Sequence, residues 1–283
     1  MTFTMRWRAT AAALTVSAAV LSAQTPITPP KNGYTPAEDV QLGREAAAEV
    51  ERQVPLLSDK QVLSTMAGIG RRLVNAIPSE LRHSEFKYSV QVVNDADINA
   101  FALPGGPMYV NRGMIEAAGR EGEAAGVMAH ELAHVALRHG TAQATEATKY
   151  QLGGLAGAII GSVVGGKVGS AISQGTNIGL GTVFLKYSRA YEKQADLLGA
   201  QIMARAGYDP RDLAEMFQTI EEQGGLGGPE WLSDHPNPGN RYEYISAEAS
   251  QLRVKNPVRD TRAFEATQER LKGMPRAPKT QTR

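Results

Sequence analysis

The sequence contains no cysteine among its 283 residues. No disulfide can therefore stabilise the fold, and a lipid anchor attached to an N-terminal cysteine is excluded. An excess of charge of one sign is also lacking, since 30 lysines and arginines oppose 29 aspartates and glutamates and leave a net charge of +1. A basic excess would indicate a nucleic-acid partner and an acidic excess a disordered chain, so we expect neither.

Long uninterrupted apolar runs are scarce as well, and the first one lies at the N-terminus. Arg6 and Arg8 precede the uncharged stretch 9–21, which is shorter than the roughly 20 residues that a membrane-spanning helix needs. This pattern is typical of a secretory signal peptide, residues 1–23, cleaved after Ala23. We therefore expect a periplasmic protein. The alternative is that the segment stays uncleaved and anchors the chain to the membrane.

A second apolar segment, 152–185, is rich in glycine, alanine, isoleucine and valine, and Lys167 is its one charged residue. Glycines interrupt it before any 20-residue apolar span is reached. Small residues at every third or fourth position allow helices to pack closely in water as well as in lipid. The pattern favours a mobile helical excursion with peripheral membrane contact, and the alternative is a membrane-inserted segment.

The rest of the chain predicts one domain, 34–272, between a proline-containing linker, 24–33, and a basic, disordered tail, 273–283. Thr35, Pro36 and Glu38 form the start signal of its first helix. The predicted helices cover about 36–53, 59–76, 121–139, 209–223, 239–253 and 261–271, and the predicted strands about 86–93, 98–103 and 108–110. Gly140 is expected to end the helix 121–139.

The most informative motif is His130-Glu131-Leu-Ala-His134. Two histidines four apart on a helix project from one face, so both imidazoles can reach one metal ion. Zinc accepts imidazole nitrogen at about 2.0–2.1 Å, and a catalytic site keeps one position open for water. Glu131 is placed to approach that water without binding the metal. The helix is apolar nearly all round and should be buried, which leaves its polar residues in need of partners.

A third protein ligand is required, and two candidates follow the motif. His139 lies five residues after His134, which turns it about 140° from the ligand face, so we interpret it as a helix C-terminal histidine favoured by the helix dipole. Glu192 and Asp196 are four apart and share one helical face. Glu192 is the predicted metal ligand, and Asp196 is predicted to accept the other ring N–H of a ligand histidine. The alternative for this pair is a solvated surface helix.

These motifs together resemble the HtpX and CAAX prenyl endopeptidase family of gluzincin metallopeptidases, in particular its soluble periplasmic branch. The matching segments are Asn99–Gly106, His130–His134 with Arg138 and His139, Ser188–Asp196, and His235-Pro236 with Arg241. The resemblance implies an α+β, mainly helical zincin fold with a small sheet beside the metal-binding helix, and one Zn²⁺ per chain. The chain departs from the integral-membrane members in lacking clear spanning helices, and it lacks the C-terminal helical repeats of other members.

The resemblance also implies roles for further residues. The segment made of Asn99, Ala100, Phe101, Ala102 and Leu103 resembles the edge strand that pairs with substrate, although an interior hairpin is an alternative. Arg189 and Arg241 are expected to hold carboxylates near the site, or to form ordinary structural ion pairs. His235 resembles the histidine near the metal. It is expected to stabilise the oxyanion or to occupy the fourth metal position, and the alternative is a loop histidine without a catalytic role.

The sequence thus predicts a zinc-dependent endopeptidase that acts on unfolded or outer-membrane proteins in protein quality control. The alternative from another functional class is a metal-binding periplasmic chaperone or assembly factor whose closed site rarely cleaves. The sequence carries no signal for an oligomeric state.

Overall fold

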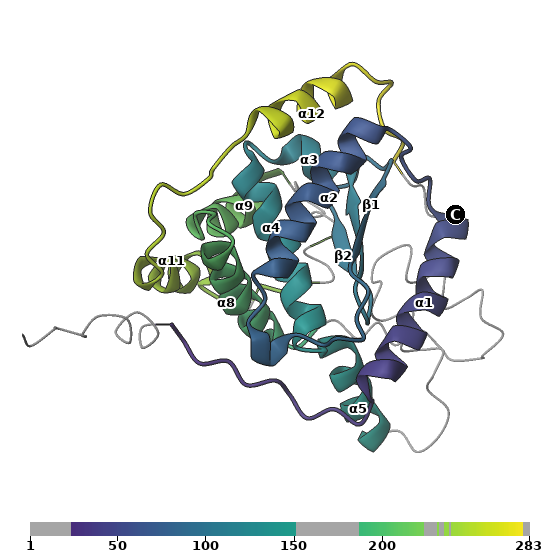
Figure 1. Cartoon of the computed structure of the whole chain (residues 1–283), viewed down its shortest axis with the longest axis vertical. Helices are drawn as coiled ribbons and strands as arrows, with labels where there is room; N and C mark the ends of the chain where they lie inside the picture. Colours follow the sequence, from purple (N-terminus) through teal and green to yellow (C-terminus); the bar gives the residue numbers. More distant parts are fainter. Residues whose placement is uncertain (1–23, 151–186, 224–230, 232–234, 238, 280–283) are drawn as a thin grey trace, which may run out of the picture.

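The computed structural model describes residues 24–150, 187–223, 231, 235–237 and 239–279 (Figure 1). The predicted signal peptide, 1–23, and the glycine-rich segment, 152–185, lie outside the described residues. The described helices and strands are α1 (Pro36–Gln53), α2 (Lys60–Asn75), the 3-10 turn η1 (Ser79–Leu81), β1 (Ser89–Val93), β2 (Ala100–Ala102), β3 (Pro107–Asn111), α3 (Arg112–Ala117), α4 (Glu121–Ala136), α5 (His139–Tyr150), α8 (Arg189–Arg205), α9 (Arg211–Gln223), α11 (Arg241–Gln251) and α12 (Arg262–Lys272).

The first helix begins where the sequence predicts. The Thr35 side chain accepts a hydrogen bond from the Glu38 N–H, and the Glu38 carboxylate accepts one from the Thr35 N–H at 2.7 Å. This capping box, followed by Pro36 at the first helical position, satisfies backbone donors that a helix start leaves without partners. The N-terminus of α1 is therefore fixed by local sequence.

The sheet has three strands in the order β1-β3-β2, with β1 parallel and β2 antiparallel to β3. Because side chains alternate across a strand, each strand contributes to two cores. Phe101 and Tyr109 stack with ring centroids 5.1 Å apart in the core shared with α1, whereas Ala102 and Met108 belong to the core shared with α2 and α4. Helices therefore cover both faces of this small sheet (Figure 1), and the predicted α+β, mainly helical fold is confirmed.

Helix α4 is the centre of the domain, and all of its residues are buried. The sheet and α2 lie against one side of it, and α8 and α9 lie against the other (Figure 1). The close approach of α8 and α9 to α4 depends on glycines. A Cβ at Gly126 would lie 2.8 Å from Leu213 Cα, and one at Gly199 would lie 3.1 Å from the His130 N. The apolar sequence of α4 thus reflects helices and strands packed around its whole circumference.

The predicted end of this helix at Gly140 is wrong. Helix α4 ends at Ala136, Arg138 adopts a left-handed conformation with φ of 59°, and α5 begins at His139. The Arg138 guanidinium pairs with the Asp39 carboxylate and donates to the Tyr34 carbonyl, both near α1. These tertiary contacts compensate the cost of a left-handed non-glycine residue, so the break is decided by α1 rather than by the local sequence.

The structure adds two features that sequence periodicity missed. Helix α3 was not predicted, and its buried Arg112 donates to the carbonyls of Leu271 and Pro275 at 2.7 and 2.8 Å. The Pro278 carbonyl also accepts from the Ala96 N–H at 2.9 Å. The described part of the segment predicted as a disordered tail is therefore bonded to the domain. Within the described residues, no helix is both long and apolar enough to cross a membrane.

The packing of α1 against the β2–β3 turn leads to a testable prediction. A Cβ at Gly43 would lie 1.7 Å from the Pro104 carbonyl oxygen, so Gly43→Ala must displace α1 or the turn. We expect the free energy of unfolding to fall by about 1–3 kcal/mol, measured by denaturant titration. The control is Gly68→Ala in α2, whose Cβ would meet only the Arg71 side chain at 4.0 Å. It should be neutral or stabilising by up to about 1 kcal/mol, and equal stabilities of the two variants would contradict the proposed steric conflict.

Candidate metal centre

The two histidines of the motif meet as their spacing predicts. His130 and His134 lie one turn apart on α4, their Nε2 atoms are 3.1 Å apart, and both side chains are buried. Burial lowers the pKa of His134 well below its usual value. The imidazole is therefore neutral, which is the form that binds a metal.

Glu192 reaches these histidines from the first turn of α8. Ser188 is the N-cap of that helix, and its hydroxyl accepts a hydrogen bond from the Tyr191 N–H. The Glu192 carboxylate oxygens lie 3.6 Å from His130 Nε2 and 3.4 Å from His134 Nε2. Burial acts to raise the pKa of Glu192, but neighbouring imidazoles, foremost His235, hold it well below its usual value. The carboxylate is therefore ionised although it is fully buried.

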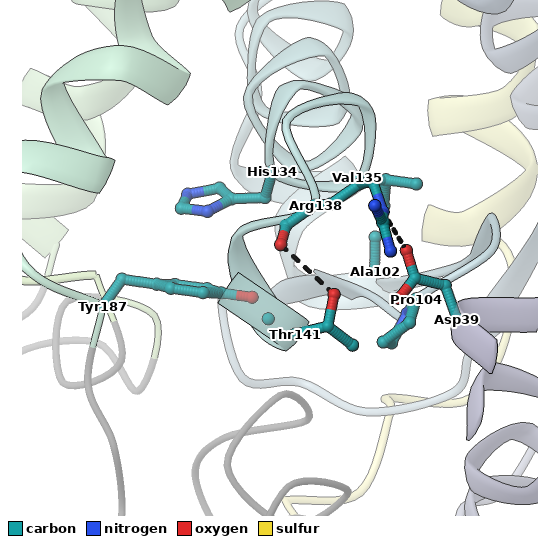
Figure 2. Close-up of a pocket in the computed structure, with 9 residues that line it drawn as sticks. Asp39, Ala102, Pro104, His134, Val135, Arg138, Thr141 and Tyr187 are labelled. Atoms are coloured by element: carbon teal, nitrogen blue, oxygen red, sulfur yellow. Dashed lines mark hydrogen bonds and ion pairs between the residues drawn. The ribbon is translucent and has the colours of Figure 1, made fainter. Parts of the chain in front are cut away.

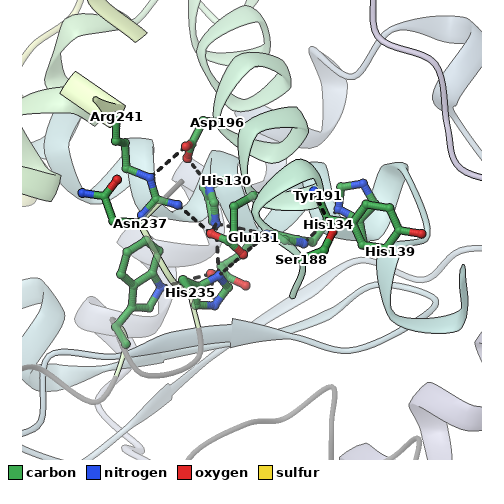
Figure 3. Close-up of polar contacts among 12 residues, drawn as sticks. His130, Glu131, His134, His139, Ser188, Tyr191, Asp196, His235, Asn237 and Arg241 are labelled. Carbon is green, nitrogen blue, oxygen red and sulfur yellow. Dashed lines mark hydrogen bonds and ion pairs between the residues drawn. The ribbon is translucent and has the colours of Figure 1, made fainter. Parts of the chain in front are cut away.

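His235 completes the cluster from the segment between α9 and α11 (Figure 3). Its Nδ1 atom lies 3.2 Å from His130 Nε2 and 3.1 Å from Glu192 Oε1. The four side chains of His130, His134, Glu192 and His235 each place a ligand atom within 4.8 Å of the others, and all are buried. The residues that directly precede His235 in the sequence, 232–234, lie outside the described residues.

The spacing of these atoms fits a tetrahedral metal site. Ligands about 2.0–2.1 Å from a common centre stand about 3.3 Å from one another in a tetrahedron. Five separations fall between 3.1 and 3.6 Å, with Glu192 Oε2 facing His130 and Glu192 Oε1 facing His134 and His235. Three imidazoles and one carboxylate also supply the nitrogen and oxygen donors that Zn²⁺ accepts.

Arg241 holds the acidic side of this site together. Its guanidinium donates to Glu192 Oε2 at 2.6 Å and to Asp196 Oδ2 at 2.8 Å, and it is buried beneath the rings of Phe217 and Trp231. Burial alone would lower the pKa of Arg241, but the two carboxylates raise it above its usual value. The guanidinium is therefore the permanent counter-charge of two buried carboxylates, as expected for Arg241.

Arg189 does not share this position. It is exposed at the first position of α8, and among the described residues no carboxylate is paired with it. Its expected role of holding a carboxylate near the site therefore stays a prediction.

Asp196 lies behind His130, on the side away from the cluster. Its Oδ1 atom is 2.9 Å from His130 Nδ1, although the angle between them is not that of a hydrogen bond. Neither atom has another hydrogen-bond partner among the described residues. The structure thus brings Asp196 and His130 together as the sequence predicts.

Glu131 faces the cluster from the same turn of α4. Trp231 Nε1 donates to Glu131 Oε1 at 3.2 Å, and His235 Nε2 lies 3.4 Å from the same oxygen. Trp231 is fully buried and stacks on His235 with centroids 4.5 Å apart. Sequence reasoning missed Trp231, because an isolated tryptophan carries no spacing that links it to a motif.

His139 lies in a different helix from the one that the sequence predicts. It begins α5 instead of ending α4, and its Nδ1 lies 3.0 Å from His134 Nδ1 (Figure 3). Its Nε2 lies 3.1 Å from Gln194 Oε1, and the ring stacks on Tyr191 with centroids 4.5 Å apart. Burial lowers the pKa of His139 to about 3, so the ring is neutral. The angular argument failed because it assumed a continuous helix across Arg138.

The predicted substrate strand borders the cluster. Ala102 of β2 and Pro104 line a small pocket together with His134, Val135 and Tyr187 (Figure 2). The Tyr187 ring stacks on His134 with centroids 4.1 Å apart. All five residues from Asn99 to Leu103 are buried. The segment is therefore the sheet edge nearest the metal-binding helix.

The comparison with known families decides the classification. Residues 65–249 match the model of peptidase family M48, which covers more than half of the chain. The chain belongs to peptidase family M48. The matched region contains the whole cluster together with Glu131, Asp196 and Arg241, and peptidases of this family depend on a metal.

Relatives of this M48 chain include named proteases from bacteria and mitochondria. It is 26% identical over 243 residues to "Beta-barrel assembly-enhancing protease" of Escherichia coli K12, an alignment that covers 84% of this chain and 49% of the relative. It is 34% identical over 169 residues to "Mitochondrial metalloendopeptidase OMA1" of Saccharomyces cerevisiae, covering 56% of this chain and 46% of the relative. The chain spans about half the length of the curated relatives it matches.

The contact of His139 with His134 predicts a tautomer effect on metal affinity. If His134 offers Nε2 to a metal, its Nδ1 carries the proton and donates to His139 Nδ1, which then donates from Nε2 to Gln194. We expect His139→Leu to weaken metal binding by about 10–100-fold. His139→Asn retains an acceptor near Nδ1 and should bind within a few-fold of wild type. Competition with a chromogenic chelator measures both, and equal affinities of the Leu and Asn variants would rule out this role.

Proposed function

We propose that this chain is a zinc-dependent endopeptidase with one Zn²⁺ held by His130, His134 and Glu192. The single observation that carries the proposal is the close cluster of four buried ligand atoms beside the carboxylate of Glu131. A bound zinc ion lowers the pKa of a water molecule and polarises a carbonyl oxygen. The family and the named metalloendopeptidase relatives support the same activity.

Glu131 is proposed to move the proton during peptide hydrolysis. Its Oε1 accepts from Trp231 Nε1, which holds the carboxylate beside the cluster. From there it takes the proton of the attacking water and delivers it to the leaving amine. Glu131 is not a metal ligand in this proposal, because Glu192 already supplies the carboxylate of the cluster.

Substrate is proposed to bind as an extended strand along Asn99–Leu103. The opposite edge of β2 is already paired with β3, so only the edge toward the metal site can accept another strand. Ala102 and His134 line the same pocket, which connects that edge to the cluster (Figure 2). Arg241 and Asp196 are proposed to hold Glu192 and His130 in place, as second-layer partners of a metal site do.

The setting is proposed to be the bacterial periplasm, with removal of residues 1–23 and unfolded or outer-membrane proteins as substrates. The signal-like N-terminal sequence and the printed name of the Escherichia coli relative support this. Two alternatives to a freely soluble periplasmic protein are part of this proposal. Residues 1–23 stay attached as a membrane anchor, or segment 152–185 makes peripheral contact with the membrane. Fractionation of cells that express the tagged chain distinguishes a soluble periplasmic protein from a membrane-bound one.

Substitution of Glu131 tests the enzymatic proposal. Glu131→Gln keeps the shape of the side chain but cannot accept the proton, so we expect hydrolysis of an unfolded protein substrate to fall at least 10²-fold with one zinc per chain retained. Metal analysis and peptide mass spectrometry of the digest measure the two effects. Loss of zinc would identify Glu131 as a ligand. Unreduced hydrolysis would show that Glu131 is not the base.

His235 is proposed to occupy the fourth metal position and to keep the enzyme silent until its segment moves. Its Nδ1 stands at tetrahedral spacing from His130 and Glu192, the place that a catalytic site leaves for water. This arrangement also favours the second candidate function, a metal-binding chaperone with a closed site. The oxyanion role differs from both, since it needs His235 beside the scissile carbonyl rather than in the ligand cluster.

The variant His235→Ala separates these roles. Removal of a plug should raise hydrolysis of unfolded protein several-fold, because water and substrate gain the fourth position. Removal of an oxyanion donor should lower kcat by about 10²–10³-fold. Initial rates at equal zinc content measure the difference, with Asn237→Ala in the same segment as the control. An unchanged rate with intact zinc would exclude both roles.

A further inference from the structure

Among the described residues, only half of the outer edge of β1 is covered by another segment. Lys87 and Ser89 donate their N–H groups to Gly105 and Gly106, on the side of β3. Because backbone groups alternate along a strand, the N–H and C=O groups of the even residues point away from β3. Two of these outward groups are taken, since the Leu57 N–H donates to the Val92 carbonyl and the Asn94 N–H donates to the Pro55 carbonyl.

The outward backbone groups of Tyr88 and Val90 remain unpaired among the described residues. Each residue offers one donor and one acceptor at the spacing of a β-ladder. An exposed edge of this kind binds an extended backbone more readily than any other structure, because only an extended chain supplies the matching alternation of acceptors and donors.

A cavity of about 410 Å³ opens beneath this free edge, between α2 and the sheet. Its apolar lining comes from Val74 of α2, Val90 of β1, Met108 of β3 and Leu132 of α4. Leu132 lies two residues from each histidine of the motif, which places it about 200° around α4 from them. The cavity is therefore separate from the metal centre, on another face of the same helix.

One charged group of the cavity lacks a partner among the described residues. Arg71 is the one charged residue among the described residues that line the cavity, and it is exposed without an ion pair among them. The cavity thus combines an apolar interior with a cation at its mouth.

We propose that the free half of β1 and this cavity form a docking site for an extended polypeptide segment that carries an apolar side chain next to an acidic one. The backbone of the segment pairs with Tyr88 and Val90. Its apolar side chain enters the cavity, and its carboxylate meets Arg71. The site is distinct from the proposed substrate strand at β2, which lies on the opposite edge of the sheet.

Peptide binding to the full chain tests the site. The probe is a fluorescein-labelled nine-residue peptide of alternating Thr and Val with a central Phe followed by Glu, measured by anisotropy against the Glu131→Gln protein so that it stays intact. Arg71→Glu should weaken binding at least tenfold, and so should Ala67→Trp, which fills the cavity from α2. Arg44→Glu, the same charge change on the exposed face of α1, should bind as the parent does.

Circular dichroism melting checks that each variant is folded. If Ala67→Trp does not fold, the binding result of Arg71→Glu alone tests the docking proposal. Parent-like affinity of folded Arg71→Glu would overturn the proposal, and so would equal binding of a peptide in which Ser replaces the Phe. Because the assay needs no hydrolysis, it succeeds or fails independently of the proposed peptidase activity.

Hydrogen exchange followed by NMR locates the bound peptide. The amides of Tyr88 and Val90 should exchange at least tenfold more slowly when the peptide is bound, because they gain acceptors. The Lys87 amide is an internal reference, since its 2.7 Å bond to the Gly105 carbonyl is present without peptide. Protection that appears only at β2 and α4 would place the peptide at the metal centre and would contradict docking at β1.

Discussion

The site depends on one buried ionic contact, in which the Arg241 guanidinium bridges the carboxylates of Glu192 and Asp196. Both acidic side chains are fully buried beside the histidines of α4. Without a counter-charge, two buried carboxylates would cost several kcal/mol each in lost solvation. Arg241 supplies that charge from α11, under the aromatic rings of Phe217 and Trp231. The contact therefore joins α8, α9 and α11 into one support for the metal ligands.

The histidines are held from the opposite direction by the break between α4 and α5. Because Arg138 turns left-handed, α5 begins at His139, whose ring returns to His134 instead of pointing away from it. The turn is maintained by Asp39 and Tyr34, so α1 is coupled to the orientation of His134. The two helices that carry His130, His134 and Glu192, α4 and α8, are thus held by elements distant in sequence.

Much of the fold was predictable because its signals are local. The capping box at Thr35, the alternation in β1 and the helical spacing of His130 and His134 act within a few residues and predicted the correct element types. Errors arose where distant contacts override local preference. The end of α4 at Ala136 depends on contacts with α1 and the residues before it, and the bonding of the chain from Leu271 onward depends on Arg112 of α3. No local sequence pattern predicts either contact.

The sequence by itself determined which residue types could bind a metal and on which helical faces they lie, because the spacing of His130 with His134 and of Glu192 with Asp196 follows from helix geometry. Only the tertiary structure decided that these two faces meet and that His235 reaches the fourth corner of the cluster. It also decided that Arg241 neutralises the carboxylates. The physical reason is that helix periodicity fixes directions within one element, whereas distances between elements are set by how their small and apolar residues pack.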